Sequence, residues 1–229
     1  MSERIGVVGA GYVGLPLAVA FAQRGKSVTV IDTNPARVAD LNRGHSPVED
    51  VSHEQLAACD GKLSATTDYA ALSDCAYVVI CVPTPLNSHR EPDLSALEAS
   101  ASALGEVLQA GTLVVLESTS YPGTTRDVLT PILAERSGLV AGKQFAVAFS
   151  PERIDPGRDD FTLANTPKVV GGIDEPSTQR ASEFYSMVCE TVLPVSSPEA
   201  AEMSKLLENI FRSVNIALVN ELAILADRM

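Results

Sequence analysis

Three glycines near the N-terminus have the spacing needed to bind a phosphate-containing ligand. Gly9, Gly11 and Gly14 follow a short apolar run at residues 5–8 and open an Ala- and Leu-rich segment. Between a strand and a helix, the first glycine permits a tight turn, the second lets the backbone approach a pyrophosphate, and the third lets helix and strand pack closely. The amides of the helix N-terminus then bind the phosphates. We therefore predict a dinucleotide site that also includes Tyr12 and Val13.

An acidic residue follows at the distance that such a site requires. Asp32 ends the second apolar run, 18 positions after Gly14. A carboxylate there accepts hydrogen bonds from the adenosine ribose hydroxyls and repels a 2′-phosphate, so we expect NAD and not NADP. A structural glycine turn beside a surface aspartate is the alternative, and the combined context favours the cofactor.

Polar residues later in the chain could supply catalysis. Thr119 ends a strand-like run, where a hydroxyl could position water or the cofactor. Glu152 begins a Pro- and Gly-rich segment, and a carboxylate there could act as a general base if burial tunes its proton affinity. Lys205 and Asn209 stand four positions apart, so on a helix both side chains project from one face. Taken alone, each pattern also fits an ordinary structural role, such as a surface ion pair for Glu152.

The elements that must position these residues alternate along the chain. Val- and Ile-rich runs are separated by segments of helical periodicity, which is typical of βαβ units around a parallel sheet. We predict strands at residues 4–9, 27–31, 63–65, 77–81, 112–117, 144–149, 168–171 and 191–194. Right-handed crossovers then give a Rossmann-like, doubly wound α/β fold with its ligand crevice at the carboxyl ends of the strands. The composition of residues 150–167 predicts a long loop.

The C-terminal segment predicts a long helix. Ser197 as N-cap and Pro198 in the first turn provide its start, and no stop signal precedes Met229. Such a helix spans about 45 Å, more than one small domain needs. We therefore expect an NAD-binding domain at residues 1–196 and the beginning of a connector helix at residues 197–229, with a second domain absent from the chain.

Composition narrows the classes of function. The net charge of −12 argues against a general nucleic-acid or anionic-membrane binder. No apolar run approaches the roughly 20 residues that a membrane span requires, and the N-terminus enters a strand instead of a signal-peptide pattern, so we expect a cytoplasmic protein. Neither the cysteines nor the histidines have metal-ligand spacing, so we expect no metal site and reduced structural thiols at Cys59, Cys75, Cys81 and Cys189.

Several segments resemble the UDP-glucose and UDP-N-acetylhexosamine dehydrogenase family in order and spacing. They are residues 32–37 (DTNPAR), 81–86 (CVPTPL), 117–125 (ESTSYPGTT) and 150–157 (SPERIDPG), with a fifth set between 201 and 221. The resemblance spans essentially the whole chain. It implies an NAD-dependent 6-dehydrogenase that oxidises the C6 alcohol of a UDP-hexose to a carboxylate, a four-electron oxidation in two steps.

The resemblance also implies roles for individual residues. Further cofactor contacts would come from Arg37, Pro83, Thr84, Pro85, Ser118 and Thr119. Thr119 would help to hold the hydrolytic water, and Glu152 would activate it. Lys205 and Asn209 would stabilise negative charge on the substrate oxygen. The sugar site would include Glu152, Arg153, Ile154, Asp155, Lys205 and Asn209.

The Tyr-Pro-Gly-Thr-Thr turn at 121–125 and the loop at 150–157 look more like the UDP-N-acetylglucosamine branch of that family than its UDP-glucose branch, so we expect UDP-N-acetylglucosamine as substrate. UDP-glucose and UDP-N-acetylmannosamine are the alternatives. The resemblance further implies a homodimer built around the long helix and a place in the synthesis of polysaccharide precursors.

One catalytic group of the family has no counterpart in this sequence. The family's nucleophilic cysteine follows the long helix in a Gly-Gly-x-Cys segment, and none of the four cysteines matches it. We therefore expect a truncated, catalytically incomplete portion that retains cofactor binding. Two other interpretations are a hydroxyacid or 6-phosphogluconate type of dehydrogenase, which would lack the Ser-Pro-Glu-Arg loop, and a non-catalytic NAD-sensing module, which would not need the catalytic groups.

Overall fold

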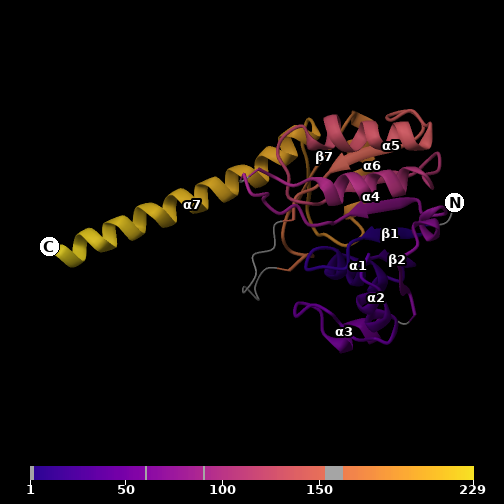
Figure 1. The fold of residues 1–229 in the computed structure, drawn as a ribbon, viewed down its shortest axis with the longest axis horizontal. Coiled ribbons are helices and arrows are strands. Elements are labelled where there is room, and N and C mark those ends of the chain that lie inside the picture. Colours follow the sequence, from indigo (N-terminus) through magenta and orange to yellow (C-terminus); the bar gives the residue numbers. More distant parts are fainter. Residues whose placement is uncertain (1–2, 60, 90, 153–161) are drawn as a thin grey trace.

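The structure, a computed structural model, describes residues 3–59, 61–89, 91–152 and 162–229 (Figure 1). Its centre is an eight-stranded sheet with the order β3-β2-β1-β4-β5-β6-β7-β8. The strands are β1 (Ile5–Val8), β2 (Val28–Ile31), β3 (Leu63–Thr66), β4 (Tyr77–Ile80), β5 (Leu113–Leu116), β6 (Ala146–Phe149), β7 (Lys168–Gly172) and β8 (Val192–Pro194). Each strand predicted from the sequence is present, with its ends shifted by at most two residues.

The first six strands are parallel and have the doubly wound order predicted from the sequence. β1 pairs with both β2 and β4, so the direction of winding reverses there. In such a sheet the ligand crevice lies at this switch point, beyond the carboxyl ends of the strands. β1, β2 and β5 are buried along their whole length, because helices cover both faces of the sheet, and this burial explains their unbroken apolar sequences.

Two strands run against the predicted direction, because β8 pairs parallel with β7 and is therefore reversed with it. β7 pairs antiparallel with β6, with Phe149 opposite Gly171 and Ala148 opposite Gly172, whereas a parallel sheet was predicted. A parallel return needs a crossover of a dozen or more residues, usually a helix, and the Pro- and Gly-rich sequence of residues 150–167 does not favour one. Because β7 is reversed, its first residue lies at the sheet edge where β1 to β6 end.

Helices cover both faces of the sheet. α1 (Gly14–Gln23) and α6 (Glu175–Tyr185) share one apolar cluster with one face. α4 (Ser95–Gly105) and α5 (Thr130–Ser137) share another with the opposite face, and their ribbons lie side by side (Figure 1). Phe21 of α1 stacks on Phe184 of α6, with ring centroids 4.5 Å apart. The sheet is therefore enclosed between two layers.

Shorter helices complete the connections between strands. They are α2 (Pro35–Asn42), α3 (His53–Ala57), the 3₁₀ turn η1 (Tyr69–Leu72) and the π-helical turn η2 (Thr124–Leu129). Asn34 caps α2, since its side chain accepts from the backbone amides of Ala36 and Arg37. This cap fixes the start of α2 beside the end of β2.

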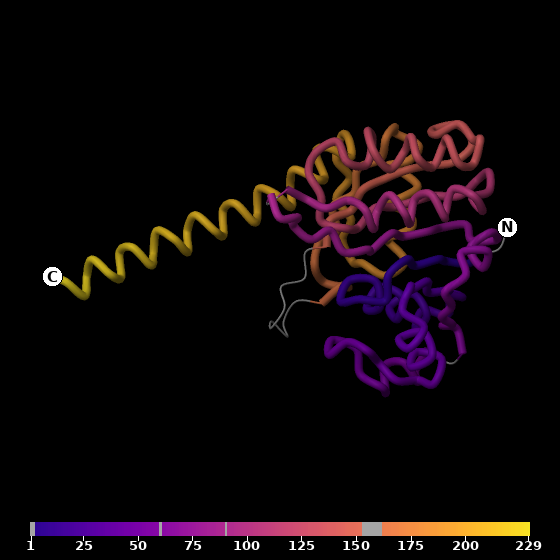
Figure 2. The backbone as a smooth tube through the Cα atoms, viewed as in Figure 1, coloured from indigo at the N-terminus to yellow at the C-terminus, as the bar shows by residue number. Residues whose placement is uncertain are grey.

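The last helix, α7 (Pro198–Arg228), projects away from the body of the protein (Figure 1, Figure 2). Ser197 caps it and Pro198 occupies its first turn, as predicted. Pro198, Ala201 and Glu202 near its start are buried, whereas large apolar side chains further along, such as Phe211, are exposed. By length and composition alone, α7 is apolar enough to cross a membrane, whereas the sequence analysis predicted no segment of that kind.

Candidate dinucleotide-binding and active site

A pocket of about 380 Å³ lies at the carboxyl ends of β1, β2, β4 and β5. Most of the residues predicted to bind the cofactor line it, namely Gly9, Gly11, Tyr12, Val13, Asp32, Arg37, Pro83, Thr84, Ser118 and Thr119. Gly14 and Pro85 are not among the lining residues. Cys81, Val82 and Glu117 also line the pocket, although they were not predicted as cofactor contacts.

The glycine turn has the geometry that its sequence predicts. Gly9 has a φ of +104°, and a Cβ there would meet the carbonyl oxygen of Cys81 at 2.6 Å. A Cβ on Gly14 would lie 2.0 Å from the carbonyl oxygen of Gly9, so Gly14 acts by letting α1 start close to the strand. A Cβ on Gly11 would meet nothing within 4 Å, so the backbone there faces open space.

The N-terminus of α1 adjoins this pocket. Val13, the residue before the helix, lines the pocket, and within the described part of the chain no side chain caps the helix. The first amides of a helix have no partner inside the helix, and they carry the positive end of its dipole. Such an end binds anions, and here it can hold a pyrophosphate.

Asp32 is fixed by backbone amides at the other side of the pocket. It is 7% exposed; Oδ2 accepts from the Ala10 amide at 3.0 Å and Oδ1 from the Asn34 amide at 2.9 Å. Arg37 donates from Nη1 to Oδ2, also at 3.0 Å. Oδ1 retains accepting capacity, since a carboxylate oxygen has two lone pairs, so Asp32 can still accept from a ribose hydroxyl.

Two hydroxyl groups join the ends of β4 and β5. Ser118 donates from Oγ to the carbonyl oxygen of Val82 at 2.6 Å, and Thr84 donates from Oγ1 to the carbonyl oxygen of Thr119. These bonds hold the loop after β4 against the loop after β5. Thr119 is itself exposed and lines the pocket, so it is accessible to a ligand.

A buried ion pair lies behind the pocket. Glu117 forms a salt bridge with Lys168, the first residue of β7, and accepts a 2.6 Å hydrogen bond from the Tyr185 hydroxyl. Burial, with a contribution from Glu152, raises the pKa of Glu117 to about 7, although Lys168 opposes this shift. Burial also acts to lower the pKa of Lys168, but the two carboxylates outweigh it and raise that pKa above its ordinary value. Lys168 is therefore a cation.

Lys168 links this pair to the predicted general base. Its Nζ lies 3.6 Å from Oε2 of Glu152, a side chain that is 15% exposed. From α7, Lys205 donates through its Nζ to the backbone carbonyl of Glu152. Burial lowers the pKa of Lys205, and the charge of Glu152 opposes that shift. Contacts therefore run from Glu117 in the pocket, through Lys168 and Glu152, to Lys205.

The structure brings together only part of the predicted sugar site. Glu152 and Lys205 are in contact, whereas Asn209 is exposed one turn further along α7. Arg153, Ile154 and Asp155 lie outside the described residues.

Glu202 is a buried polar residue whose role the sequence did not reveal. It is 0% exposed and accepts hydrogen bonds from the amide of Gly123 at 2.7 Å and from the amide and hydroxyl of Thr125 at 2.9 and 2.7 Å. These bonds attach the first turns of α7 to the turn that follows β5. Glu202 therefore fixes the part of α7 that carries Lys205.

The four cysteines are buried free thiols, as predicted. Burial raises the pKa of Cys75 and of Cys189 to about 11, and the pKa of Cys59 is raised for the same reason. For Cys81, which lines the pocket, burial and then the nearby Glu117 raise the pKa well above its ordinary value. Since the thiolate is the nucleophile, none of the four is poised for covalent catalysis near neutral pH.

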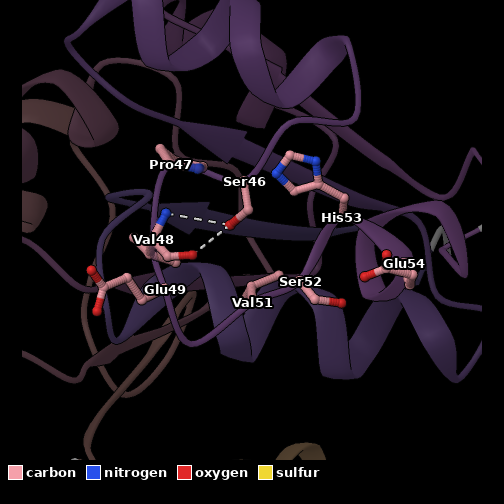
Figure 3. A pocket seen from close by; sticks show the side chains of 8 residues that line it. All are labelled: Ser46, Pro47, Val48, Glu49, Val51, Ser52, His53 and Glu54. Carbon is pink, nitrogen blue, oxygen red and sulfur yellow. Dashed lines mark hydrogen bonds between the residues drawn. The ribbon is translucent and has the colours of Figure 1, made fainter.

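A second pocket, of about 410 Å³, is lined by the loop after α2 and the first residues of α3 (Figure 3), namely Ser46, Pro47, Val48, Glu49, Val51, Ser52, His53 and Glu54. Ser46 bonds within its own loop, to Val48. The carboxylates of Glu49 and Glu54 lie on opposite sides of the view, so they do not converge on a common point (Figure 3). The pocket shares no lining residue with the crevice, and we assign the candidate site to the crevice.

Comparison with known proteins gives the same interpretation of the crevice. Residues 3–189 match the NAD-binding domain of the UDP-glucose/GDP-mannose dehydrogenase family, and residues 199–229 match the central domain of that family. The match decides between the candidate families considered above and identifies NAD as the cofactor of this domain.

Individual relatives share much of the sequence. Protein CapL of Staphylococcus aureus is 40% identical over 230 residues, which cover 100% of this chain and 54% of the relative. UDP-N-acetyl-D-glucosamine 6-dehydrogenase of Salmonella typhi is 37% identical over 227 residues, which cover 99% of this chain and 53% of the relative. The solved structure of UDP-D-ManNAc dehydrogenase from Pyrococcus horikoshii has a TM-score of 0.91 at 38% identity, over 97% of this chain and 54% of that one.

The chain thus spans about half the length of the curated relatives it matches. The two family domains follow one another along almost its whole length, and the glycine turn, Asp32 and the loops after β4 and β5 lie within the first of them. The chain therefore belongs to the UDP-glucose/GDP-mannose dehydrogenase family.

Proposed function

We propose that this chain is the NAD-binding part of a nucleotide-sugar 6-dehydrogenase that oxidises the C6 alcohol of UDP-N-acetylglucosamine to a carboxylate. Residues 1–196 are the cofactor domain and residues 197–229 the start of the connector. The observation that carries the proposal is the series of contacts from Glu117 to Lys205, because it joins the cofactor pocket to a carboxylate and an ammonium group.

The cofactor half of the site positions NAD, which on binding would accept a hydride from C6. The N-terminus of α1 holds the pyrophosphate, and Asp32 holds the adenosine ribose. The loops after β4 and β5, which Ser118 and Thr84 tie together, form the wall beside the nicotinamide. This arrangement leaves the exposed Thr119 at the point where the sugar would approach.

The reacting half of the site handles protons and charge. Glu152 acts as the base, with Thr119 holding the water that Glu152 activates. Lys205 stabilises negative charge on the substrate oxygen, and Asn209, one turn further along α7, joins it. The contact of Lys205 with the Glu152 backbone supports this assignment, because the two residues are then close enough to act on one substrate.

The identity of the sugar is the finer part of the proposal. The Salmonella relative is named for UDP-N-acetyl-D-glucosamine and the Pyrococcus structure for UDP-D-ManNAc, and both are acetamido sugars. The turn at 121–125 and the loop at 150–157 look more like the UDP-N-acetylglucosamine branch than the UDP-glucose branch, which favours an acetamido sugar. UDP-glucose, which lacks the acetamido group, is the appropriate control ligand.

Calorimetric titration of the chain with NAD, with NADP as the control, tests the cofactor half. We expect saturable binding that prefers NAD, because Asp32 repels a 2′-phosphate. Failure to bind either nucleotide would contradict an autonomous cofactor domain. Preference for NADP would contradict the role given to Asp32.

Product analysis tests the reacting half. The purified chain is mixed with NAD and, in turn, UDP-N-acetylglucosamine, UDP-N-acetylmannosamine, UDP-glucose and a panel of hydroxyacids, and NADH is counted per chain. Because its thiols are buried, we expect no sustained four-electron oxidation. Sustained turnover of a UDP-sugar would show that the chain is catalytically complete, and oxidation of a hydroxyacid instead would overturn the proposed substrate class.

We also infer that the exposed apolar side of α7 packs against a second copy in a homodimer. Leu207, Phe211, Leu218 and Leu222 are each more than half exposed, and surfaces of this kind mark interaction sites. Light scattering of the chain should give twice the monomer mass. A monomer would contradict the inference, and flotation of the chain with lipid vesicles would favour insertion of α7 into a bilayer instead.

A further inference from the structure

Lys168 has no part in the roles proposed above, yet the fold places it beside the candidate base. It is 3% exposed. Because β7 is antiparallel to β6, continuing the register of Phe149 opposite Gly171 puts Lys168 level with Glu152. In a parallel β7 the first residue would lie at the far edge of the sheet. The reversed strand therefore brings a buried cation to the edge that holds the pocket.

Lys168 is anchored on the side away from Glu152. It forms a salt bridge with Oε1 of Glu117, whose Oε2 accepts from the Tyr185 hydroxyl at 2.6 Å. The Nζ of Lys168 also lies 5.1 Å from the centroid of the Tyr185 ring, within the range of a cation–π contact. β5, β7 and α6 thus hold the ammonium group in place independently of Glu152.

We propose that Lys168 is a positioning residue that fixes the carboxylate of Glu152 at the end of β6 and keeps it ionised, while Lys205 holds the backbone of the same residue. Lys168 acts through Glu152. The inference rests on the proposed function only where it takes Glu152 as the base. One cation faces two carboxylates, so Glu117 and Glu152 compete for its charge and titrate as a coupled pair.

Other ionisable groups face this cluster from the surrounding elements. Cys81 follows β4, Tyr185 ends α6, Cys189 follows α6 and Lys205 lies on α7. Burial raises the pKa values of Cys81, Cys189 and Tyr185, which therefore stay neutral near pH 7. Glu117, with a pKa of about 7, is the group that changes charge there, and it reports on its neighbours.

Carboxyl NMR titration of the chain tests this coupling. The Glu117 signal is identified by its loss in Glu117→Gln and should titrate near pH 7. In Glu152→Gln it should titrate at lower pH, because a nearby negative charge has been removed. Glu183→Gln, which changes an exposed carboxylate on α6, is the matched control and should leave the titration unchanged. An unchanged titration in Glu152→Gln would overturn the proposal.

Variants of Lys168 test the cation itself. Lys168→Met should move the Glu117 titration upward by about one to three pH units, the usual effect of losing an adjacent opposite charge, and Lys168→Arg should restore it. If Lys168→Met does not fold, the double variant Lys168→Met/Glu117→Gln is used in its place, because it removes both buried charges together. In that double variant the Glu152 signal should titrate at higher pH than in Glu117→Gln alone. Equal values would refute the role of Lys168.

These measurements need neither cofactor nor sugar. A negative result would remove the positioning role of Lys168 but would not affect the cofactor half of the proposed function, which rests on the glycine turn and Asp32. Failure of the chain to bind NAD would count against that function and leave the coupling of the two carboxylates standing.

Discussion

Replacing Glu202 should detach the root of α7 from the sheet. Its carboxylate accepts three hydrogen bonds, two of them from the backbone amides of Gly123 and Thr125. Burial raises the pKa of Glu202, so these bonds do not fully offset the desolvation of its charge. The cost of replacing Glu202 therefore comes mainly from the amides that a shorter side chain would leave without a partner.

In Glu202→Ala both amides lose their acceptor. A buried amide without a partner costs about 1 to 3 kcal/mol, so the free energy of unfolding should fall by about 4 kcal/mol. For a chain of this size, each kcal/mol lowers the melting temperature by about 2 to 4 °C, which gives about 8 to 16 °C. Glu202→Gln keeps one accepting oxygen, and its loss should be about half as large.

Glu199→Ala on the same helix is the matched control. Glu199 pairs with Arg126 at 2.5 Å, but its side chain is 35% exposed, so the pair contributes about 1 kcal/mol or less. Thermal unfolding followed by circular dichroism, together with urea titration, measures all three variants. If Glu202→Ala melts within a degree or two of Glu199→Ala, the anchoring role of Glu202 is wrong.

Three further predictions concern the pocket and its surroundings. Asp32→Asn should raise the affinity for NADP relative to NAD by about tenfold in calorimetric titrations, because it removes the repelling charge and leaves Arg37 in place. Gly11→Ala should weaken NAD binding without lowering the melting temperature, since its Cβ would meet no protein atom. Gly14→Ala should weaken NAD binding and also lower the melting temperature, because its Cβ would collide with the backbone of Gly9. Equal melting temperatures for the two variants would contradict this difference. Glu117 has a pKa of about 7 in the folded chain, against an ordinary value of 4.5. The stability that its protonation contributes is therefore complete below about pH 4.5 and is lost as the pH rises through about 7. The free energy of unfolding should fall by about 3 kcal/mol over this range. Urea midpoints across this range should show the fall in the unchanged chain and a flatter profile in Glu117→Gln.

Local sequence signals predicted much of the fold and the cofactor half of the site. Gly9, Gly11, Gly14 and Asp32 act through short-range geometry, in which a turn, a helix start and a strand end follow one another along the chain. The strands could be predicted for the same reason, because burial on both faces leaves unbroken apolar runs. Their boundaries and the doubly wound order followed from these signals.

The remaining features depend on contacts between residues far apart in sequence. The reversal of β7 could not be read from its own apolar sequence, which is the same for either direction. Glu117 and Lys168 are 51 positions apart, and Glu202 lies 77 positions from Thr125. One signal was available: Glu117 is a charged residue directly after a wholly apolar strand, and such a residue must find a partner when buried.

The attachment of α7 at one end gives it the mechanics of a lever. The helix is about 45 Å long, so a tilt of about 5° at its root moves its far end by about 4 Å. The same tilt moves Lys205, about 10 Å from the start of the helix, by less than about 1 Å. Contacts along the outer part of α7 therefore have the greatest influence on the direction of the helix. The hydrogen bonds of Glu202 form the pivot of this lever, close to the candidate site.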